Sequence, residues 1–295
     1  MRTLTIFLLT GLLILSCNKR GMELNELKSK IENKFKNVEG DFGFAFREIG
    51  NPENQILINE QEVFHAASTM KTPVLIEVFR QVEAGKFSLD DSILVENNFK
   101  SIVDGSSYQM DITRDSGDAL YDLLGKKTTI YNLVYDMITV SSNLATNIVI
   151  EIVDAEKVTE TMRKLGAEKI QVLRGVEDMK AFDAGLNNST TAFDMMLIFE
   201  SIANCKMVND TSCKEMIKIL SDQKFNSVIP SLLPDDVVTA HKTGSIDGVQ
   251  HDTGLVFLPN GKKYAIIFLS KNLVERRPAI TAMAEISKMI YDYMN

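Results

Sequence analysis

Strand patterns lie at both ends of this chain, and helical patterns fill the sequence between them. Near the N-terminus, "DFGFAFREI" alternates Phe42, Phe44 and Phe46 on one face, as a half-buried strand does, and "QILIN" is its expected partner. Three further strand patterns, "DVVTAHKTG", "TGLVFL" and "KYAIIFLS", stand near the C-terminus, with an Asn260-Gly261 hairpin turn between the last two. A sheet made from segments so far apart must be closed by both ends of the chain.

The middle of the chain predicts helices. Apolar residues follow helical spacing over residues 74–82, 130–138 and 144–152, and helices are also expected over about residues 23–35 and 278–294. We therefore predict an α/β (α+β) fold, in which an antiparallel sheet flanked by helices carries an inserted all-helical lobe. One domain of residues 22–295 is expected, with the α/β lobe at about 22–70 and 220–295 and the helical lobe at about 71–219. A site is expected in the cleft between the lobes.

The N-terminal stretch "MRTLTIFLLTGLLILSC" has the layout of an export signal. Basic Arg2 precedes an apolar run, Leu4 to Leu15, that is too short to span a bilayer comfortably, so residues 1–16 are predicted to be a signal peptide. "Ile-Leu-Ser-Cys" also resembles the lipobox of bacterial lipoproteins, which makes Cys17 the lipidated first residue of the mature chain. The alternative is ordinary secretion with an unmodified Cys17. Either way we expect an exported, periplasmic protein, with a lipid anchor as its only membrane contact.

The composition excludes several classes of function. A net charge of -8 without any Lys/Arg run argues against nucleic acid as a partner and favours a small-molecule or peptide substrate. Cys205 and Cys213 are spaced for a helix, a turn and a second helix, which leaves a disulfide and two free thiols equally open. No metal site is expected, because there is no CxxC and His65, His241 and His251 lack ligand spacing.

A serine and a lysine three residues apart open one of the predicted helices. The Ser-x-x-Lys pattern occurs at Ser16, Ser68 and Ser221, but only Ser68 stands at the start of an apolar helical stripe. Three residues make nearly one turn, so the Ser68 hydroxyl and the Lys71 amine are expected on the same face. A lysine whose pKa is lowered can take the proton of a nucleophilic serine. Taken alone, the pair also fits a serine helix cap followed by a solvated lysine.

Two further motifs decide between these readings. "Ser141-Ser142-Asn143" is expected in an interhelical loop, and "Lys242-Thr243-Gly244" at the end of a late strand. Ser-x-x-Lys, a Ser-x-Asn motif and Lys-Thr-Gly, in this order, resemble the signature of class A β-lactamases and penicillin-binding proteins. The resemblance extends over about residues 24–294 and implies the fold of that family.

The resemblance implies roles for the reacting groups. Ser68 would be the acylated nucleophile, Lys71 its proton partner, and Ser141 the relay of a proton to the departing nitrogen. The backbone N–H groups of Ser68 and Ser245 would form the oxyanion hole.

The resemblance also implies how substrate is held. Asn143 would hydrogen-bond the substrate side chain, Lys242 and Thr243 would hold its carboxylate, and Gly244 would let it lie along the strand edge. No cofactor or metal is implied.

Deacylation is where the chain departs from the family. Glu177 is the candidate for activating the hydrolytic water, but Asp178 replaces the usual proline after it and is a rival base. Ala181 stands where an asparagine usually helps to hold the water, and Asn188 stands where an acid usually pairs with the loop arginine, here Arg174. In the serine motif, Ser142 replaces the usual central aspartate.

We therefore expect a monomeric serine hydrolase that opens β-lactam amides through a Ser68 acyl-enzyme. One alternative is a D-alanyl-D-alanine peptidase-like enzyme, or another small amide or ester hydrolase, that is slow on β-lactams. A second alternative is a non-catalytic sensor of β-lactams or cell-wall fragments. His65 is expected to be a packed histidine, and the His251-Asp252 pair is expected to shape a turn.

Overall fold

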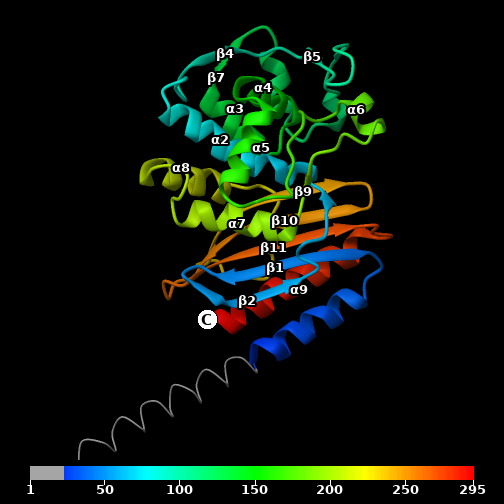
Figure 1. The fold of residues 1–295 in the computed structure, drawn as a ribbon, viewed down its shortest axis with the longest axis vertical. Coiled ribbons are helices and arrows are strands. Elements are labelled where there is room, and N and C mark those ends of the chain that lie inside the picture. The colour runs from blue at the N-terminus through cyan, green and yellow to red at the C-terminus, as the bar shows by residue number, and fades with distance from the viewer. Residues whose placement is uncertain (1–22) are drawn as a thin grey trace, which may run out of the picture.

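A five-stranded antiparallel sheet, with strand order β2-β1-β11-β10-β9, lies between two layers of helices (Figure 1). The computed structural model describes residues 23–295; the predicted signal peptide and Cys17 lie outside them. β1 (Asp41–Glu48) and β2 (Asn51–Ile58) come from the N-terminal part, whereas β9 (Val238–Ile246), β10 (Val249–Phe257) and β11 (Lys263–Lys271) come from the C-terminal part. Because β1 pairs with β11, the two ends of the chain close the sheet, and the predicted fold class is confirmed.

One face of the sheet is covered by the two terminal helices, residues 23–36 and α9 (Arg276–Met294) (Figure 1). The alternation predicted for β1 is correct: Phe42, Phe44 and Phe46 all point into the core beneath these helices, and Phe42 stacks on Phe35 at 4.6 Å between ring centroids. Ala45, on the opposite face of β1, belongs to the second core. Burying one side chain in two on each face matches the period of a pleated strand.

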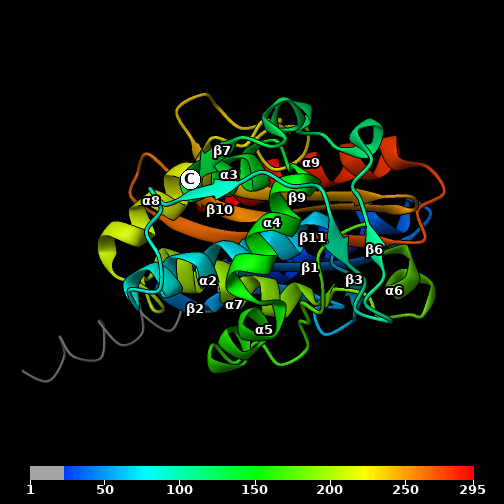
Figure 2. The ribbon, with the colours of Figure 1, turned by 90° about the horizontal axis from the view of Figure 1, so that it is seen from above.

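The helical part rests on the other face of the sheet (Figure 2). α7 (Ala192–Ala203) packs on β1, β10 and β11, and α8 (Asp210–Ser221) packs on β9. The remaining helices are α2 (Lys71–Glu83), α3 (Ile130–Thr139), α4 (Asn143–Val153), α5 (Ala155–Lys164) and α6 (Met179–Asp183), with 3-10 helices η1 (Ala67–Met70), η2 (Ile112–Arg114) and η3 (Asp118–Leu123). Three short strand pairs join loops of this part: β3 (Phe64–His65) with β8 (Ser189–Thr190), β4 (Ser92–Leu94) with β7 (Lys127–Thr129), and β5 (Phe99–Lys100) with β6 (Ser107–Tyr108).

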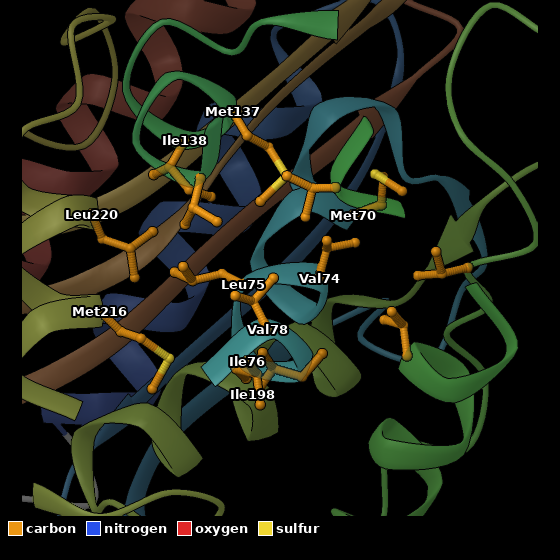
Figure 3. Packing of buried hydrophobic residues seen from close by; sticks show 14 of the residues in the cluster. Met70, Val74, Leu75, Ile76, Val78, Met137, Ile138, Ile198, Met216 and Leu220 are labelled. Carbon is orange, nitrogen blue, oxygen red and sulfur yellow. The ribbon is translucent and has the colours of Figure 1, made fainter. Parts of the chain in front are cut away.

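α2 is the central helix of this part. Every residue from Lys71 to Phe79 is buried, and α2 packs against α3, α4, α5, α7 and α8 (Figure 3). Pro73 is tolerated because it lies in the first turn, where its missing N–H has no helical acceptor. The first turn of α2 is therefore fixed on all sides.

Three local expectations need correction. Lys242-Thr243-Gly244 lies inside β9 and not at its end, because pairing with β10 continues to Ile246. His251 and Asp252 lie inside β10 and shape no turn. The serine motif is only partly a loop, since Asn143 is already the first residue of α4.

Cys205 follows α7, and Cys213 lies in α8, as the helix-turn-helix pattern predicts. Both are free thiols. Within residues 23–295, no helix is both long and apolar enough to cross a bilayer.

Candidate active site

Ser68 lies in η1, directly before the first turn of α2. The preceding residue, Ala67, has a φ of 45°, a left-handed conformation that costs energy for a residue other than glycine. His65 supports this turn, because its Nδ1 accepts a hydrogen bond from the Ala67 N–H at 3.0 Å. The Ser68 side chain is only partly buried, and no group among residues 23–295 is hydrogen-bonded to its hydroxyl. The hydroxyl is thus held at a strained turn and left free to react.

Lys71 is fully buried, which rules out the solvated lysine that the sequence alone allows. Its Nζ donates to the Ser141 carbonyl oxygen at 2.7 Å, to Ser141 Oγ at 3.2 Å and to Asn143 Oδ1 at 3.1 Å. Burial lowers the pKa of Lys71 to about 7, although the carboxylates of Asp115 and Glu177 oppose this shift. Near neutral pH a large fraction of the amine is therefore uncharged and able to take a proton.

Ser141 connects the two lysines of the site. Its Oγ accepts from Lys71 Nζ at 3.2 Å and from Lys242 Nζ at 3.0 Å. A hydroxyl has two acceptor positions and one proton, so with both acceptor positions used its proton remains available to a third group. Ser141 has a φ of 59°, and the next residue, Ser142, donates its N–H to the Asp136 carbonyl oxygen at 3.1 Å. The local backbone is strained and held by this bond, so the hydroxyl has a fixed direction.

Lys242, Thr243 and Gly244 present one edge of the sheet to Ser68. β9 is an edge strand, so backbone groups on its outer side are not paired within the sheet. Lys242 is fully buried, and burial followed by the charge of Lys71 holds its pKa well below the usual value. A Cβ on Gly244 would lie 3.0 Å from the Ser68 backbone nitrogen, so only glycine leaves this approach open. Ser245, the other expected oxyanion-hole residue, is exposed beside it.

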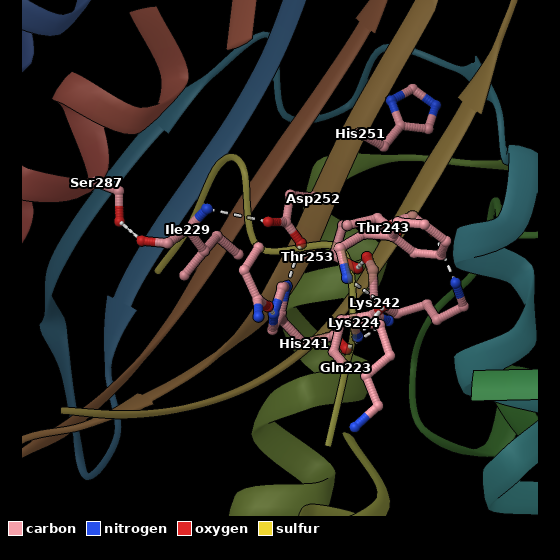
Figure 4. Close-up of polar contacts among 12 residues, drawn as sticks. Gln223, Lys224, Ile229, His241, Lys242, Thr243, His251, Asp252, Thr253 and Ser287 are labelled. Atoms are coloured by element: carbon pink, nitrogen blue, oxygen red, sulfur yellow. Dashed lines mark hydrogen bonds and ion pairs between the residues drawn. The ribbon is translucent and has the colours of Figure 1, made fainter. Parts of the chain in front are cut away.

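A buried polar network supports β9 from behind (Figure 4). His241 Nδ1 lies 2.8 Å from Asp252 Oδ1, and Asp252 Oδ2 accepts from the Ile229 N–H at 3.0 Å. Thr253 Oγ1 donates to the Lys242 carbonyl oxygen at 3.1 Å. This network fixes the strand that carries Lys242, and nothing in the sequence indicated it.

His251 has a separate packing role. Its Nε2 lies 2.8 Å from the His65 carbonyl oxygen, and complete burial lowers its pKa to about 4. His251 therefore ties β10 to the segment that leads to Ser68, and Asp252 pairs with His241 instead of with its neighbour.

Glu177 contacts Asn143 of the site, and Asp178 does not. Glu177 Oε1 accepts from Asn143 Nδ2 at 2.8 Å, and Oε2 accepts from the Asp111 N–H at 3.4 Å. Asp178 is buried: its carboxylate accepts from Ser101 Oγ and the Ile102 N–H, both at 2.9 Å, and caps α6. All of these contacts are structural, so the expectation that Asp178 is a rival base is wrong.

The Arg174 side chain, in the loop that carries Glu177, is held by neutral groups. Arg174 donates to the carbonyl oxygens of Leu186 and Gly175 and to Asn187 Oδ1, and forms no ion pair within the described part of the chain. Asn188 Oδ1 accepts from the Arg174 N–H at 3.3 Å. Asn188 therefore bonds Arg174 only at its backbone, and the guanidinium is held by Asn187 and two carbonyl oxygens instead of by an acid.

One charged residue near the site was missed from the sequence. Asp115 lies before η3, and its carboxylate contacts the first residues of α4. It is 28 residues from Asn143 in the chain and belongs to no motif, so no local pattern could have found it.

The comparisons with known proteins agree with this geometry. A sequence model described as the Beta-lactamase enzyme family matches residues 26–294. A beta-lactamase from Bacteroides uniformis is 24% identical over the whole length of both chains. Among solved structures, a beta-lactamase from Sphaerobacter thermophilus aligns with a TM-score of 0.75 and 24% identity, covering 91% of this chain and 95% of that chain. PBP-A aligns with a TM-score of 0.78 and 23% identity, covering 91% and 96%. The structural likeness shows the shared fold, and the family match shows that this chain belongs to the beta-lactamase enzyme family.

Proposed function

We propose that this enzyme opens β-lactam amides through a covalent acyl-enzyme on Ser68. The observation that carries the proposal is the meeting of two buried lysines, Lys71 and Lys242, on the Ser141 hydroxyl. Burying two amines costs folding free energy, and such a cost is typical of a catalytic site.

We propose that acylation uses these groups as follows. The neutral fraction of Lys71 takes the Ser68 proton as Ser68 Oγ bonds to the lactam carbonyl carbon. The backbone N–H groups of Ser68 and Ser245 stabilise the oxyanion, while Lys242 and Thr243 hold the substrate carboxylate. When the C–N bond breaks, Ser141 gives its proton to the nitrogen and regains one from a neighbouring lysine.

Deacylation requires a water molecule activated by Glu177. Its carboxylate is oriented by Asn143, which also accepts a hydrogen bond from Lys71. The base for acylation, Lys71, and the base for deacylation, Glu177, are therefore both bound to the Asn143 side-chain amide. The Glu177 backbone has a φ of 60°, a strained conformation that supports a functional reading.

The alanine at position 181 supports a second candidate function, in which deacylation is slow. It is buried and offers no polar side chain to a water molecule, unlike the usual asparagine. A leucine-to-glutamate mutant of PBP-A, which shares the fold, has a solved structure as an acyl-enzyme complex with penicillin G. The alternative is a D-alanyl-D-alanine peptidase-like enzyme, or another small amide or ester hydrolase. β-Lactams would acylate such an enzyme, and the acyl-enzyme would be hydrolysed slowly. A non-catalytic sensor is disfavoured, because binding alone needs no lysine with a lowered pKa.

The hydrolysis of a chromogenic cephalosporin tests the proposal. The mature enzyme should hydrolyse it with multiple turnovers, and Ser68→Ala should abolish turnover while retaining the melting temperature. A single stoichiometric burst followed by no turnover would favour the peptidase-like alternative. No reaction at all would favour the sensor.

We also propose that the protein is exported to the periplasm as a monomer and anchored there through lipidated Cys17. The N-terminal sequence supports the export and the anchor. Cys17→Ala should move the protein from the membrane fraction to the soluble periplasmic fraction. An unchanged membrane fraction would contradict the anchor, and a dimer in size-exclusion chromatography with light scattering would contradict the monomer.

A further inference from the structure

The Asp115 carboxylate collects hydrogen bonds from several surrounding elements. Two of its donors are the first backbone N–H groups of α4, those of Asn143 at 2.9 Å and Leu144 at 2.8 Å. The others are the Gly117 N–H at 2.9 Å, the Tyr121 hydroxyl at 3.2 Å and Ser142 Oγ at 3.4 Å. A partly buried carboxylate with this many donors is held in one position.

The start of α4 needs such an anion. The first N–H groups of a helix have no acceptor within the helix, and the helix dipole makes this end positive. Ser142 caps only the Ala145 N–H, at 3.2 Å, and leaves those of Asn143 and Leu144 to Asp115. The first of these, Asn143, contacts both Lys71 and Glu177 through its side chain.

The small side chain of Ser142 is linked to Asp115 by packing. A Cβ on Gly117 would lie 2.5 Å from Ser142 Cβ, so the turn of residues 115–117 sits directly against Ser142. The turn therefore places the Asp115 carboxylate next to the Ser142 side chain.

We propose that Asp115 is a positioning residue that supplies, from a separate segment, the carboxylate missing from the serine motif. It anchors the first turn of α4 and thereby fixes Ser141 and Asn143 around Lys71. It also places a negative charge beside the Lys71 amine. This inference rests on the proposed acylation of Ser68.

The charge has its own measurable effect. Three charged groups act on the Lys71 amine or lie against it: Asp115, Glu177 from its loop, and Lys242 from β9. The two carboxylates raise the pKa of Lys71 against the larger effect of burial. Removing the charge of Asp115 therefore lowers the pKa of Lys71, and a larger fraction of the amine becomes neutral at low pH.

The test compares Asp115→Asn with Asp118→Asn in the mature enzyme. Asp118 is exposed and makes no side-chain hydrogen bond within the described part of the chain, so its replacement removes one nearby charge and nothing else. The rate of Ser68 acylation by benzylpenicillin is measured by quench and intact mass between pH 5 and 9. Asp115→Asn should slow acylation about 10- to 100-fold at pH 8, because small displacements of reacting groups are costly. Its half-maximal pH should fall by roughly 0.5 to 1 unit.

Two results overturn the inference. The first is an acylation rate in Asp115→Asn equal to that of Asp118→Asn. The second is a slower rate with an unchanged pH profile, which would make Asp115 an ordinary structural residue. If the unsubstituted enzyme neither forms an adduct with the drug nor hydrolyses it, the proposed function itself fails. The wild-type reaction therefore separates the two failures.

Discussion

Replacing Glu177 with glutamine should separate the two halves of the reaction. Glutamine keeps the acceptor that faces Asn143 Nδ2, at 2.8 Å in the native chain, but cannot take a proton from water. General base catalysis contributes about 10²- to 10⁴-fold, so deacylation should slow by that factor, which is about 3 to 5 kcal/mol in barrier height. Ala181 adds no second polar group to hold the water, so little should replace the lost base.

Acylation should respond differently to the same substitution. The Glu177 charge raises the pKa of Lys71, so its removal lowers that pKa and leaves more neutral amine below pH 7. Acylation by benzylpenicillin at pH 6 should therefore be unchanged or slightly faster. Quenched-flow intact mass measurements give both rate constants. Asp183→Asn, an exposed carboxylate in α6, is the matched control. Equal deacylation rates for Glu177→Gln and the native enzyme would refute the role of Glu177 as the base.

Three other changes follow from the same contacts. In the native enzyme, the acylation rate should rise with pH and reach half of its maximum near pH 7, the pKa of Lys71, because only the neutral amine accepts a proton. A flat profile from pH 5 to 8 in stopped-flow assays would contradict this. Gly244→Ala should slow acylation about tenfold or more, since its methyl group would lie 3.0 Å from the Ser68 backbone nitrogen. Acylation kinetics equal to those of the native enzyme would contradict the need for glycine at this position. Asp252→Ala should lower the free energy of unfolding by about 2 to 5 kcal/mol in urea titrations, because the buried His241 ring and the Ile229 N–H both lose their hydrogen-bond partner. A loss below about 1 kcal/mol would show that Asp252 is not needed.

Much of the scaffold could be predicted because its signals are local. The alternation of Phe42, Phe44 and Phe46 follows from the two-residue period of a strand, and both cores obey it. The Asn260-Gly261 turn was equally readable, and Gly261 has the φ of 85° that such a turn requires.

Errors arose where tertiary contacts decide. The strand that contains Lys242 seemed to end at a glycine, but pairing with β10 extends it to Ile246. Glu177 and Asp178 are neighbours with the same charge. The backbone turn at Glu177 directs its carboxylate to Asn143, whereas the Asp178 carboxylate is buried against Ser101 and Ile102.

The buried polar contacts that hold the site could not be predicted from the sequence for a related reason. Asp115 and Asn143 are 28 residues apart, and His241 and Asp252 lie on different strands. Such pairs exist only once the chain has folded, so neither spacing nor composition predicts them.

The most direct test of the central claim is a time course of intact mass after benzylpenicillin is added to the mature protein, with Ser68→Ala as the control. We expect an adduct of the mass of the intact drug that forms only when Ser68 is present and then clears as the drug is consumed. An adduct that persists while the drug remains would contradict efficient hydrolysis. An adduct that also forms on Ser68→Ala would contradict the assignment of the nucleophile.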